Sequence, residues 1–212
     1  MPTHHIPYQE TGYFSKIICD YLDQKDQVKS FYHRFPDLEG FKEQILEKSA
    51  FKAENRVILV DYLTKQYDNF EVSEATAENI KLLGESNTFT ITTGHQLNLF
   101  TGPLYFLYKI ISAIKLSRKL KQEYPESNFV PIYWMATEDH DFEEINYFML
   151  NGKKVKWNRP DITNNDKGAV GNLSTEGLDA VYKQFCAEIG STKIAKELCD
   201  LFETAYLKHD NL

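Results

Sequence analysis

The sequence predicts an α/β fold with an incomplete parallel core, because two strand-like runs flank one amphipathic helix. Residues 88–93 (TFTITT) have the composition of a β-strand, and residues 129–135 (FVPIYWM) form a nearly continuous apolar run of strand length. The second run is typical of a strand that is covered on both faces. A strand, a helix and a strand in this order form a βαβ unit, with parallel strands and a right-handed crossover.

Composition limits the class of protein. The 212 residues are 42% hydrophobic and 26% charged, which is typical of a soluble globular chain. A net charge of −7 argues against a nucleic-acid partner, and no apolar run approaches the roughly 20 residues of a membrane span. The N-terminus does not resemble a signal peptide. The three cysteines show no CxxC spacing, so we expect no disulfide framework and a cytoplasmic location.

Residues 1–86 read as a helical N-terminal region. Apolar residues recur at helical spacing in four segments, around residues 13–22, 41–46, 57–63 and 77–83. A break at Phe35-Pro36-Asp37 separates the first two, and Gly84 is a plausible stop for the fourth. We expect the tyrosines and phenylalanines of this region in the core.

Residues 87–144 carry the first half of the core. After the first strand, Thr101 is a reasonable N-cap and Pro103 suits the first turn of the helix. One apolar face of that helix comprises Leu104, Leu107, Tyr108, Ile111 and Ile114. Basic residues crowd its C-terminal end, and Pro125 ends it.

Residues 145–212 look like a connecting insertion. Asn151-Gly152 between two strand-like segments predicts a β-hairpin. Residues 158–172 are polar and predict a surface loop, and two helices are expected near 175–189 and 192–208. A single βαβ unit is too small for a complete doubly wound sheet, so we expect this chain to be the N-terminal portion of a longer protein.

Candidate site residues follow both strands at the edge where open α/β sheets bind ligands. In the first loop, Gly94 and Gly102 either let the backbone approach a ligand or only solve turn geometry. Gln96 and Asn98 can bond a polar substrate, and the helix N-terminus favours an anion. Lys109, two turns into the helix, either reaches back toward an anionic ligand or is solvated.

The second strand leads into an acidic cluster around one histidine, Thr137-Glu138-Asp139-His140-Asp141-Phe142-Glu143-Glu144. Carboxylates favour the charged form of His140, which could then donate a proton, and a carboxylate could orient its ring or act as base. Mg²⁺ or a transition metal could also bind such a cluster. The alternative is a solvated helix start capped by Asp139 or Asp141. We expect function for Asp139 and His140, helix-start roles for Glu143 and Glu144, and no structural metal site.

Three segments together resemble the bacillithiol biosynthesis cysteine-adding enzyme family: TTGHQLNLFTGPLY at 92–105, YKII at 108–111 and VPIYWMATEDHD at 130–141. The common family form of the loop is TGQQxGLFTGP, so His95 replaces a glutamine and Asn98 a glycine. The EDHD element matches without change. The likeness covers essentially the whole chain, which is about two fifths of a typical family member.

The resemblance implies a Rossmann-like core and a ligase that joins L-cysteine, through its carboxyl group, to the amine of glucosaminyl-malate. It also implies a homodimer formed by a C-terminal coiled coil, which this chain lacks together with the second half of the core. The candidate catalytic residues are then His140, Asp139 and His95. The candidate binding residues are Thr93, Gly94, Gln96, Asn98, Thr101, Gly102, Lys109, Glu138 and Asp141.

Activation of the cysteine carboxylate stays open. Adenylation is common in such reactions, so ATP is a possible cosubstrate, although the sequence has no P-loop. The core also resembles nucleotidyl-transferring enzymes whose first strand ends in HxGH; here the aligned residues are Thr92-Thr93-Gly94-His95. Two alternatives remain: a nucleotide-dependent transferase or synthetase acting on another amino acid or sugar, and a non-catalytic ligand-binding module.

Overall fold

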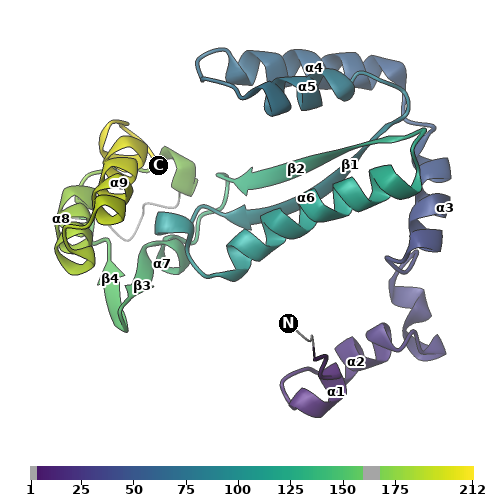
Figure 1. Cartoon of the computed structure of the whole chain (residues 1–212), viewed down its shortest axis with the longest axis horizontal. Coiled ribbons are helices and arrows are strands. Elements are labelled where there is room, and N and C mark those ends of the chain that lie inside the picture. The colour runs from purple at the N-terminus through teal and green to yellow at the C-terminus, as the bar shows by residue number, and fades with distance from the viewer. Residues whose placement is uncertain (1–3, 160–167) are drawn as a thin grey trace. The chain divides into compact units, whose positions relative to one another are not determined.

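The computed structural model describes residues 4–159 and 168–212, so part of the surface loop expected at 158–172 lies outside the described residues. The chain divides into two compact units, Met1–Phe89 and Thr90–Leu212 (Figure 1). The first unit is helical, and the second holds the parallel strands, the hairpin and the C-terminal helices.

Helices make up the first unit, as predicted. They are α1 (Tyr8–Thr11), α2 (Lys16–Leu22), the 3₁₀ helix η1 (Asp26–Phe31), α3 (Leu38–Lys48), α4 (Ala53–Tyr67) and α5 (Glu74–Leu82). Side-chain caps fix two of the starts: Asp37 accepts a hydrogen bond from the Gly40 N–H, and Ser73 accepts one from the Thr76 N–H.

One buried arginine ties α4 to the end of α5. Arg56 is 6% exposed, and its guanidinium donates to the carbonyl oxygens of Leu83 (3.1 Å) and Ser86 (3.3 Å). The last carbonyl groups of a helix have no partner within the helix, so these bonds stabilise the end of α5.

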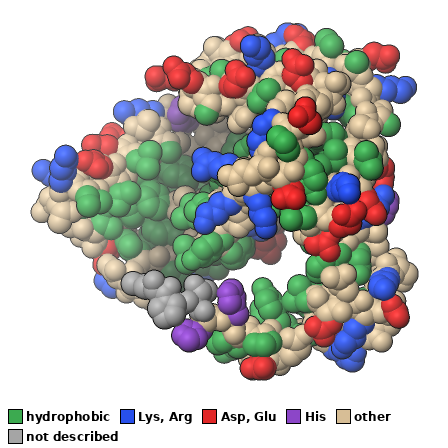
Figure 2. Space-filling model, turned by 45° about the vertical axis from the view of Figure 1, so that its right-hand side comes forward, with side chains coloured by type: hydrophobic (Ala, Val, Ile, Leu, Met, Phe, Trp, Pro, Cys, Tyr) green, Lys and Arg blue, Asp and Glu red, His purple; other side chains and the backbone are tan. Residues whose placement is uncertain are grey.

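The expectation that the aromatic side chains of this region are core is wrong for several of them. Tyr13, Phe31 and Tyr62 are 91%, 76% and 69% exposed. Within the first unit these helices pack in pairs, α2 with η1 and α4 with α5, which leaves the outer face of each pair uncovered by the other helices of that unit. Figure 2 shows hydrophobic side chains at the molecular surface beside charged ones.

The second unit contains the predicted βαβ arrangement. Strands β1 (Thr88–Gln96) and β2 (Asn128–Ala136) form a parallel two-stranded sheet, and α6 (Tyr105–Glu123) packs against β2. The sheet and helix are drawn in teal and green at the centre of Figure 1. β1 is longer than predicted and reaches Gln96, so His95 and Gln96 belong to the strand and not to the loop.

The predicted start of α6 is wrong. Thr101 does not cap it and Pro103 is not in its first turn, because the helix begins at Tyr105 with Leu104 in the N-cap position. Phe100 and Thr101 have φ values of 50° and 69° within the short 3₁₀ helix η2 (Leu99–Thr101). A left-handed backbone cannot continue into a right-handed α-helix at these residues.

The apolar stripe of α6 faces outward in this chain. Leu107, Tyr108 and Ile111 are exposed, whereas Ala113 and Leu120 are buried. The side of α6 that is covered therefore differs from the side that the apolar spacing marks.

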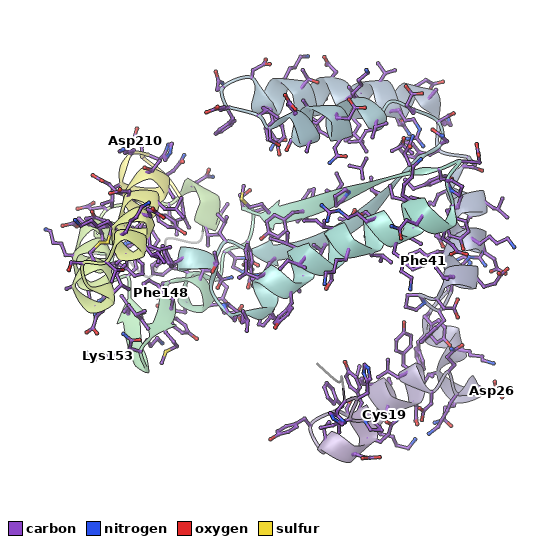
Figure 3. All side chains as sticks on the ribbon, viewed as in Figure 1. Cys19, Asp26, Phe41, Phe148, Lys153 and Asp210 are labelled. Carbon is purple, nitrogen blue, oxygen red and sulfur yellow. A yellow bond between two sulfur atoms is a disulfide. The ribbon has the colours of Figure 1, made fainter. Side chains whose placement is uncertain are left out.

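A β-hairpin follows the short helix α7 (Phe142–Ile145), as predicted. Strands β3 (Tyr147–Leu150) and β4 (Lys153–Lys156) pair antiparallel, with Leu150 opposite Lys153. Asn151 and Gly152 have φ values of 49° and 77°, which the tight turn requires. Figure 3 labels Lys153 at the tip of this hairpin.

An aromatic core holds the hairpin against the last helices, which are η3 (Val170–Asn172), α8 (Leu178–Ile189), α9 (Lys193–Phe202) and the π-helical turn η4 (Glu203–Leu207). Trp157, Phe185 and Phe202 are almost completely buried in it. Phe148 of β3, labelled in Figure 3, packs on Phe185 with ring centroids 5.9 Å apart. The two predicted C-terminal helices are confirmed.

A disulfide joins Cys186 of α8 to Cys199 of α9, so the expectation of no disulfide is wrong. The two Cα atoms lie 5.8 Å apart, within the usual range for a disulfide. The sequence separation of 13 residues places one cysteine on each helix, and only the packing of the helices brings them together. Among the described residues, no helix has the length and apolar character needed to cross a bilayer.

We expect Phe202→Ala to destabilise the second unit by about 3–5 kcal/mol, because it removes a ring that packs against four other aromatic rings. Leu201→Ala, at the residue before Phe202, is the matched control. The Leu201 side chain is 60% exposed, so we expect its free energy of unfolding to change by no more than about 0.5 kcal/mol. Denaturant unfolding followed by tryptophan fluorescence measures this, since both tryptophans lie in the second unit. Equal losses in the two variants would contradict the observed core.

Candidate functional site

The carboxyl ends of β1 and β2 bring most of the predicted site residues together. His95 and Gln96 are the last two residues of β1, and the turn that carries Glu138 to Asp141 follows the end of β2. The parallel pairing of the two strands places these ends at one edge of the sheet, as the sequence predicted.

The side-chain amide of Gln96 links the two strand ends. Its Nε2 atom donates to Asp139 Oδ2 (3.0 Å) and to Glu144 Oε2 (2.9 Å). The amide nitrogen has two hydrogens, so both bonds can form at once. Gln96 therefore holds two carboxylates in place instead of pointing freely toward solvent.

Asp139 is held as a carboxylate. The backbone N–H of Asp141 donates to its Oδ1 atom (2.9 Å), and this bond, then the Gln96 bond, lowers the pKa of Asp139 below its ordinary value. Its own carbonyl oxygen accepts from the Val170 N–H (2.7 Å). The segment that contains η3 therefore helps to hold the backbone of the turn in place.

His95 is fixed by its neighbours at the end of β1. Asn98 Nδ2 lies 3.0 Å from His95 Nδ1 and 3.2 Å from the Gln96 carbonyl oxygen. Nδ1 also lies 3.1 Å from the Gln96 carbonyl oxygen. It accepts from Asn98 when the proton is on Nε2, and it donates to the Gln96 carbonyl oxygen when the proton is on Nδ1. The ring also packs against Tyr105, with centroids 5.1 Å apart. In the tautomer that the Asn98 bond favours, His95 Nε2 carries the proton and can donate a hydrogen bond to a ligand.

Lys109 reaches back from α6 to the end of β1. Its Nζ atom donates to the Gly94 carbonyl oxygen (3.1 Å) and lies 5.6 Å from the centre of the Tyr105 ring. The ammonium group is thereby located beside His95. Lys109 thus reaches back to the strand end, and its approach to an anionic ligand there stays a prediction.

His140 and its neighbours occupy the solvent side of the turn. His140 is exposed, and with Asp141 and Arg159 it lines a cavity of about 220 Å³. Asp141 caps α7 by accepting from the Glu144 N–H (3.3 Å). Glu143 lies in the first turn of α7, where it was expected. It pairs with Lys156 (3.0 Å), and this ion pair lowers the pKa of Glu143.

Several predicted binding residues have structural reasons to be where they are. A Cβ atom at Gly94 would lie 2.9 Å from the Trp134 carbonyl oxygen, so glycine allows β1 and β2 to approach. Gly102 has a φ of 58°, and a Cβ atom there would lie 2.6 Å from the Asn98 side chain. Glu138 accepts from Trp134 Nε1 (3.1 Å). Thr93 lies half-buried in β1, and Thr101 is exposed within η2.

Two residues of the site were missed from the sequence. Glu144 was expected only at a helix start, yet it shares the Gln96 amide with Asp139. Its position five residues after Asp139, across a capped turn, was the available signal. Tyr206 was also missed; its hydroxyl accepts from the Phe100 N–H (3.0 Å) across 106 residues of sequence. No local pattern marks such a contact.

The arrangement separates two kinds of chemistry. The β1 side offers donors, namely His95 Nε2 and the Lys109 ammonium group, and these suit an anionic group on a ligand. The β2 side offers the carboxylates of Asp139 and Glu144 and the ring of His140. These suit an amine, which can donate hydrogen bonds and give up a proton.

We expect Gly94→Ala to destabilise the second unit by about 1–3 kcal/mol, because the new methyl group would force the two strands apart. Gly168→Ala serves as control, since a Cβ atom there meets no described atom within 4 Å. Denaturant unfolding of both variants tests this. An unchanged free energy of unfolding in Gly94→Ala would contradict the close approach at Trp134.

We expect Gln96→Leu to raise the pKa of Asp139 toward its ordinary value, because one of its hydrogen-bond donors is lost. A lowered pKa in the folded state stabilises the protein above the unfolded pKa, and this stabilisation is lost as the pH falls through the folded value. The variant should lose it at a higher pH. Carboxyl NMR titration measures the shift, and Glu143 is the internal control because Lys156 still lowers its pKa. An unmoved Asp139 would refute the bridge.

Comparison with known proteins identifies the family. The chain is 59% identical, over its whole length, to proteins of Flavobacterium johnsoniae and Christiangramia forsetii, and 43% identical over 83% of its length to one of Cytophaga hutchinsonii. Each relative is named "Putative cysteine ligase BshC". The chain spans 39% of the length of the first two and 33% of the third. The model "Bacillithiol biosynthesis BshC, N-terminal Rossmann-like domain" matches residues 1–212, so the chain belongs to this family.

Proposed function

We propose that the protein of which this chain forms the N-terminal part joins L-cysteine to glucosaminyl-malate, in the last step of bacillithiol biosynthesis. Family membership and the names of the relatives support a ligase of this pathway. We further propose that it acts in the cytoplasm, on small-molecule substrates, as a homodimer formed through a coiled coil.

The Gln96 bridge is the observation that carries the proposal. Gln96, the residue after His95 in β1, holds Asp139 and Glu144 at the strand end. An amine substrate with an anionic substituent, such as glucosaminyl-malate, has the two groups that these two sides of the site would bind.

Asp139 and His140 have different roles in this proposal. A carboxylate with a lowered pKa is a weak base, so Asp139 orients the amine by accepting one of its N–H hydrogen bonds. His140 then takes the proton that the nitrogen loses as it attacks the cysteine carboxyl carbon. A C–N bond forms, and the group that activates the carboxyl leaves with the electron pair of the broken C–O bond.

The β1 side would hold the negative charge. His95 Nε2, Lys109 Nζ and the N-terminus of α6 suit a malate carboxylate or a nucleotide phosphate. An ATP-dependent activation would thus use side-chain donors at the strand end in place of a P-loop. The threonine in the first histidine position of HxGH leaves His95 as the histidine of that motif.

In the full-length enzyme we expect His140→Ala to lower kcat by about 10²–10⁴-fold, which is typical for loss of a general base. Asp139→Asn should lower kcat/KM while preserving side-chain volume. Asp179→Asn on α8, whose carboxylate pairs with Lys183, is the control and should leave both parameters unchanged. Mass spectrometry of the cysteine adduct measures turnover. Wild-type turnover in His140→Ala would remove this residue from the mechanism.

Deletion of the full-length gene in its native host tests the reaction itself. We expect bacillithiol to disappear and glucosaminyl-malate to accumulate, because the final acyl transfer is lost. Competition binding with ATP, cysteine and glucosaminyl-malate then separates this reaction from a synthetase that acts on another amino acid or sugar. Unchanged thiol levels in the deletion strain would overturn the proposed function.

A further inference from the structure

We propose that Tyr206 is a positioning residue: its hydroxyl holds the site loop, residues 97–102, in the conformation that sets the orientation of His95. Tyr206 lies in η4, at the far end of the chain from this loop. The inference deepens the proposed function and rests on it for its kinetic part, but its structural part can be tested without any substrate.

The site loop has an unfavourable backbone that something must hold. Phe100 and Thr101 both have left-handed φ values, which a bulky or β-branched residue rarely adopts. Such conformations persist where the surroundings fix them, and they cluster at functional sites. Neither residue is a glycine, so the loop cannot rely on its own backbone preference.

The side chains of Leu99 and Phe100 provide part of this hold. Leu99 is fully buried, and the Phe100 ring lies between the hairpin and the last helices. Its centroid is 4.4 Å from that of Phe185, 5.4 Å from Phe202 and 5.7 Å from Phe148. These contacts fix where the ring is, but a ring contact alone does not fix the orientation of the peptide N–H.

The Tyr206 hydroxyl provides that orientation. It accepts a hydrogen bond from the Phe100 N–H at 3.0 Å, and burial raises the pKa of Tyr206, so the group stays a neutral hydroxyl. Its ring packs on Phe202, with centroids 4.9 Å apart. A π-helical turn carries the residue, and single π turns are frequent at functional sites.

The effect reaches His95 through Asn98. The Asn98 amide donates to His95 Nδ1 and to the Gln96 carbonyl oxygen, and its side chain fills the space that a Cβ atom at Gly102 would need. The Gly102 N–H in turn donates to the Leu99 carbonyl oxygen (3.0 Å). A rotation of the peptide between Leu99 and Phe100 would therefore shift Asn98. Its bond to Nδ1 favours the His95 tautomer with the proton on Nε2 over the one in which Nδ1 donates to the Gln96 carbonyl oxygen.

Tyr206→Phe in the full-length protein tests the proposal, because it removes one oxygen atom and keeps the ring. Tyr182→Phe is the matched control: its ring also packs on Phe202 (5.9 Å), and its hydroxyl bonds no residue in the described part of the chain. Hydrogen exchange of a peptide that covers the site loop, ¹⁵N-histidine NMR of the His95 ring and steady-state kinetics are measured for both variants.

We expect at least tenfold faster exchange in the site loop, a changed His95 ring signal and a raised KM in Tyr206→Phe, with none of these in Tyr182→Phe. Unchanged exchange and an unchanged His95 signal in Tyr206→Phe would overturn the proposal, as would equal effects in the two variants. Rapid exchange of the Phe100 amide in the wild type would overturn it even if the variant failed to fold. If the wild-type enzyme does not ligate cysteine, the exchange and NMR results still decide the role of Tyr206.

Discussion

The packing of one ring, that of Phe100, connects the strand ends of the parallel sheet to the hairpin and the last helices of the second unit. Phe100 follows directly after the end of β1 and its turn, yet it packs among Phe148, Phe185 and Phe202, which belong to the hairpin and the last helices. Asn98, two residues before it, bonds His95. The C-terminal helices are therefore part of the support of the strand ends, although they contribute no side chain of the EDHD element.

The acidic turn gains its order in a similar way, from partners that are distant in sequence. Gln96 approaches Asp139 from β1, and the Val170 N–H approaches the Asp139 carbonyl oxygen from η3. Glu143 and Glu144 are adjacent, but one pairs with Lys156 and the other with Gln96. Neighbouring carboxylates on one short helix thus serve two separate purposes, the packing of the hairpin and the arrangement of the site.

The sequence predicts those parts of the molecule that depend on local signals. The Asn151-Gly152 turn, a helix cap at Asp139 or Asp141 and the two core strands all follow from residues within a few positions of each other, and the structure has the cap at Asp141. The parallel strands also predict that His95 and Asp139 lie at the same edge. The left-handed Phe100, the Cys186–Cys199 bond and the Tyr206 contact depend on how helices pack, which no local pattern records.

The left-handed backbone of Phe100 has a consequence for how this position can vary. Glycine would relieve the backbone but would leave a hole in the aromatic core, whereas any β-branched residue would fit neither the backbone nor the hole. The position is frustrated in the sense that its local and its tertiary preferences oppose each other. Directed evolution of greater stability here would therefore have to change the ring pocket and the loop together, in a coordinated double substitution.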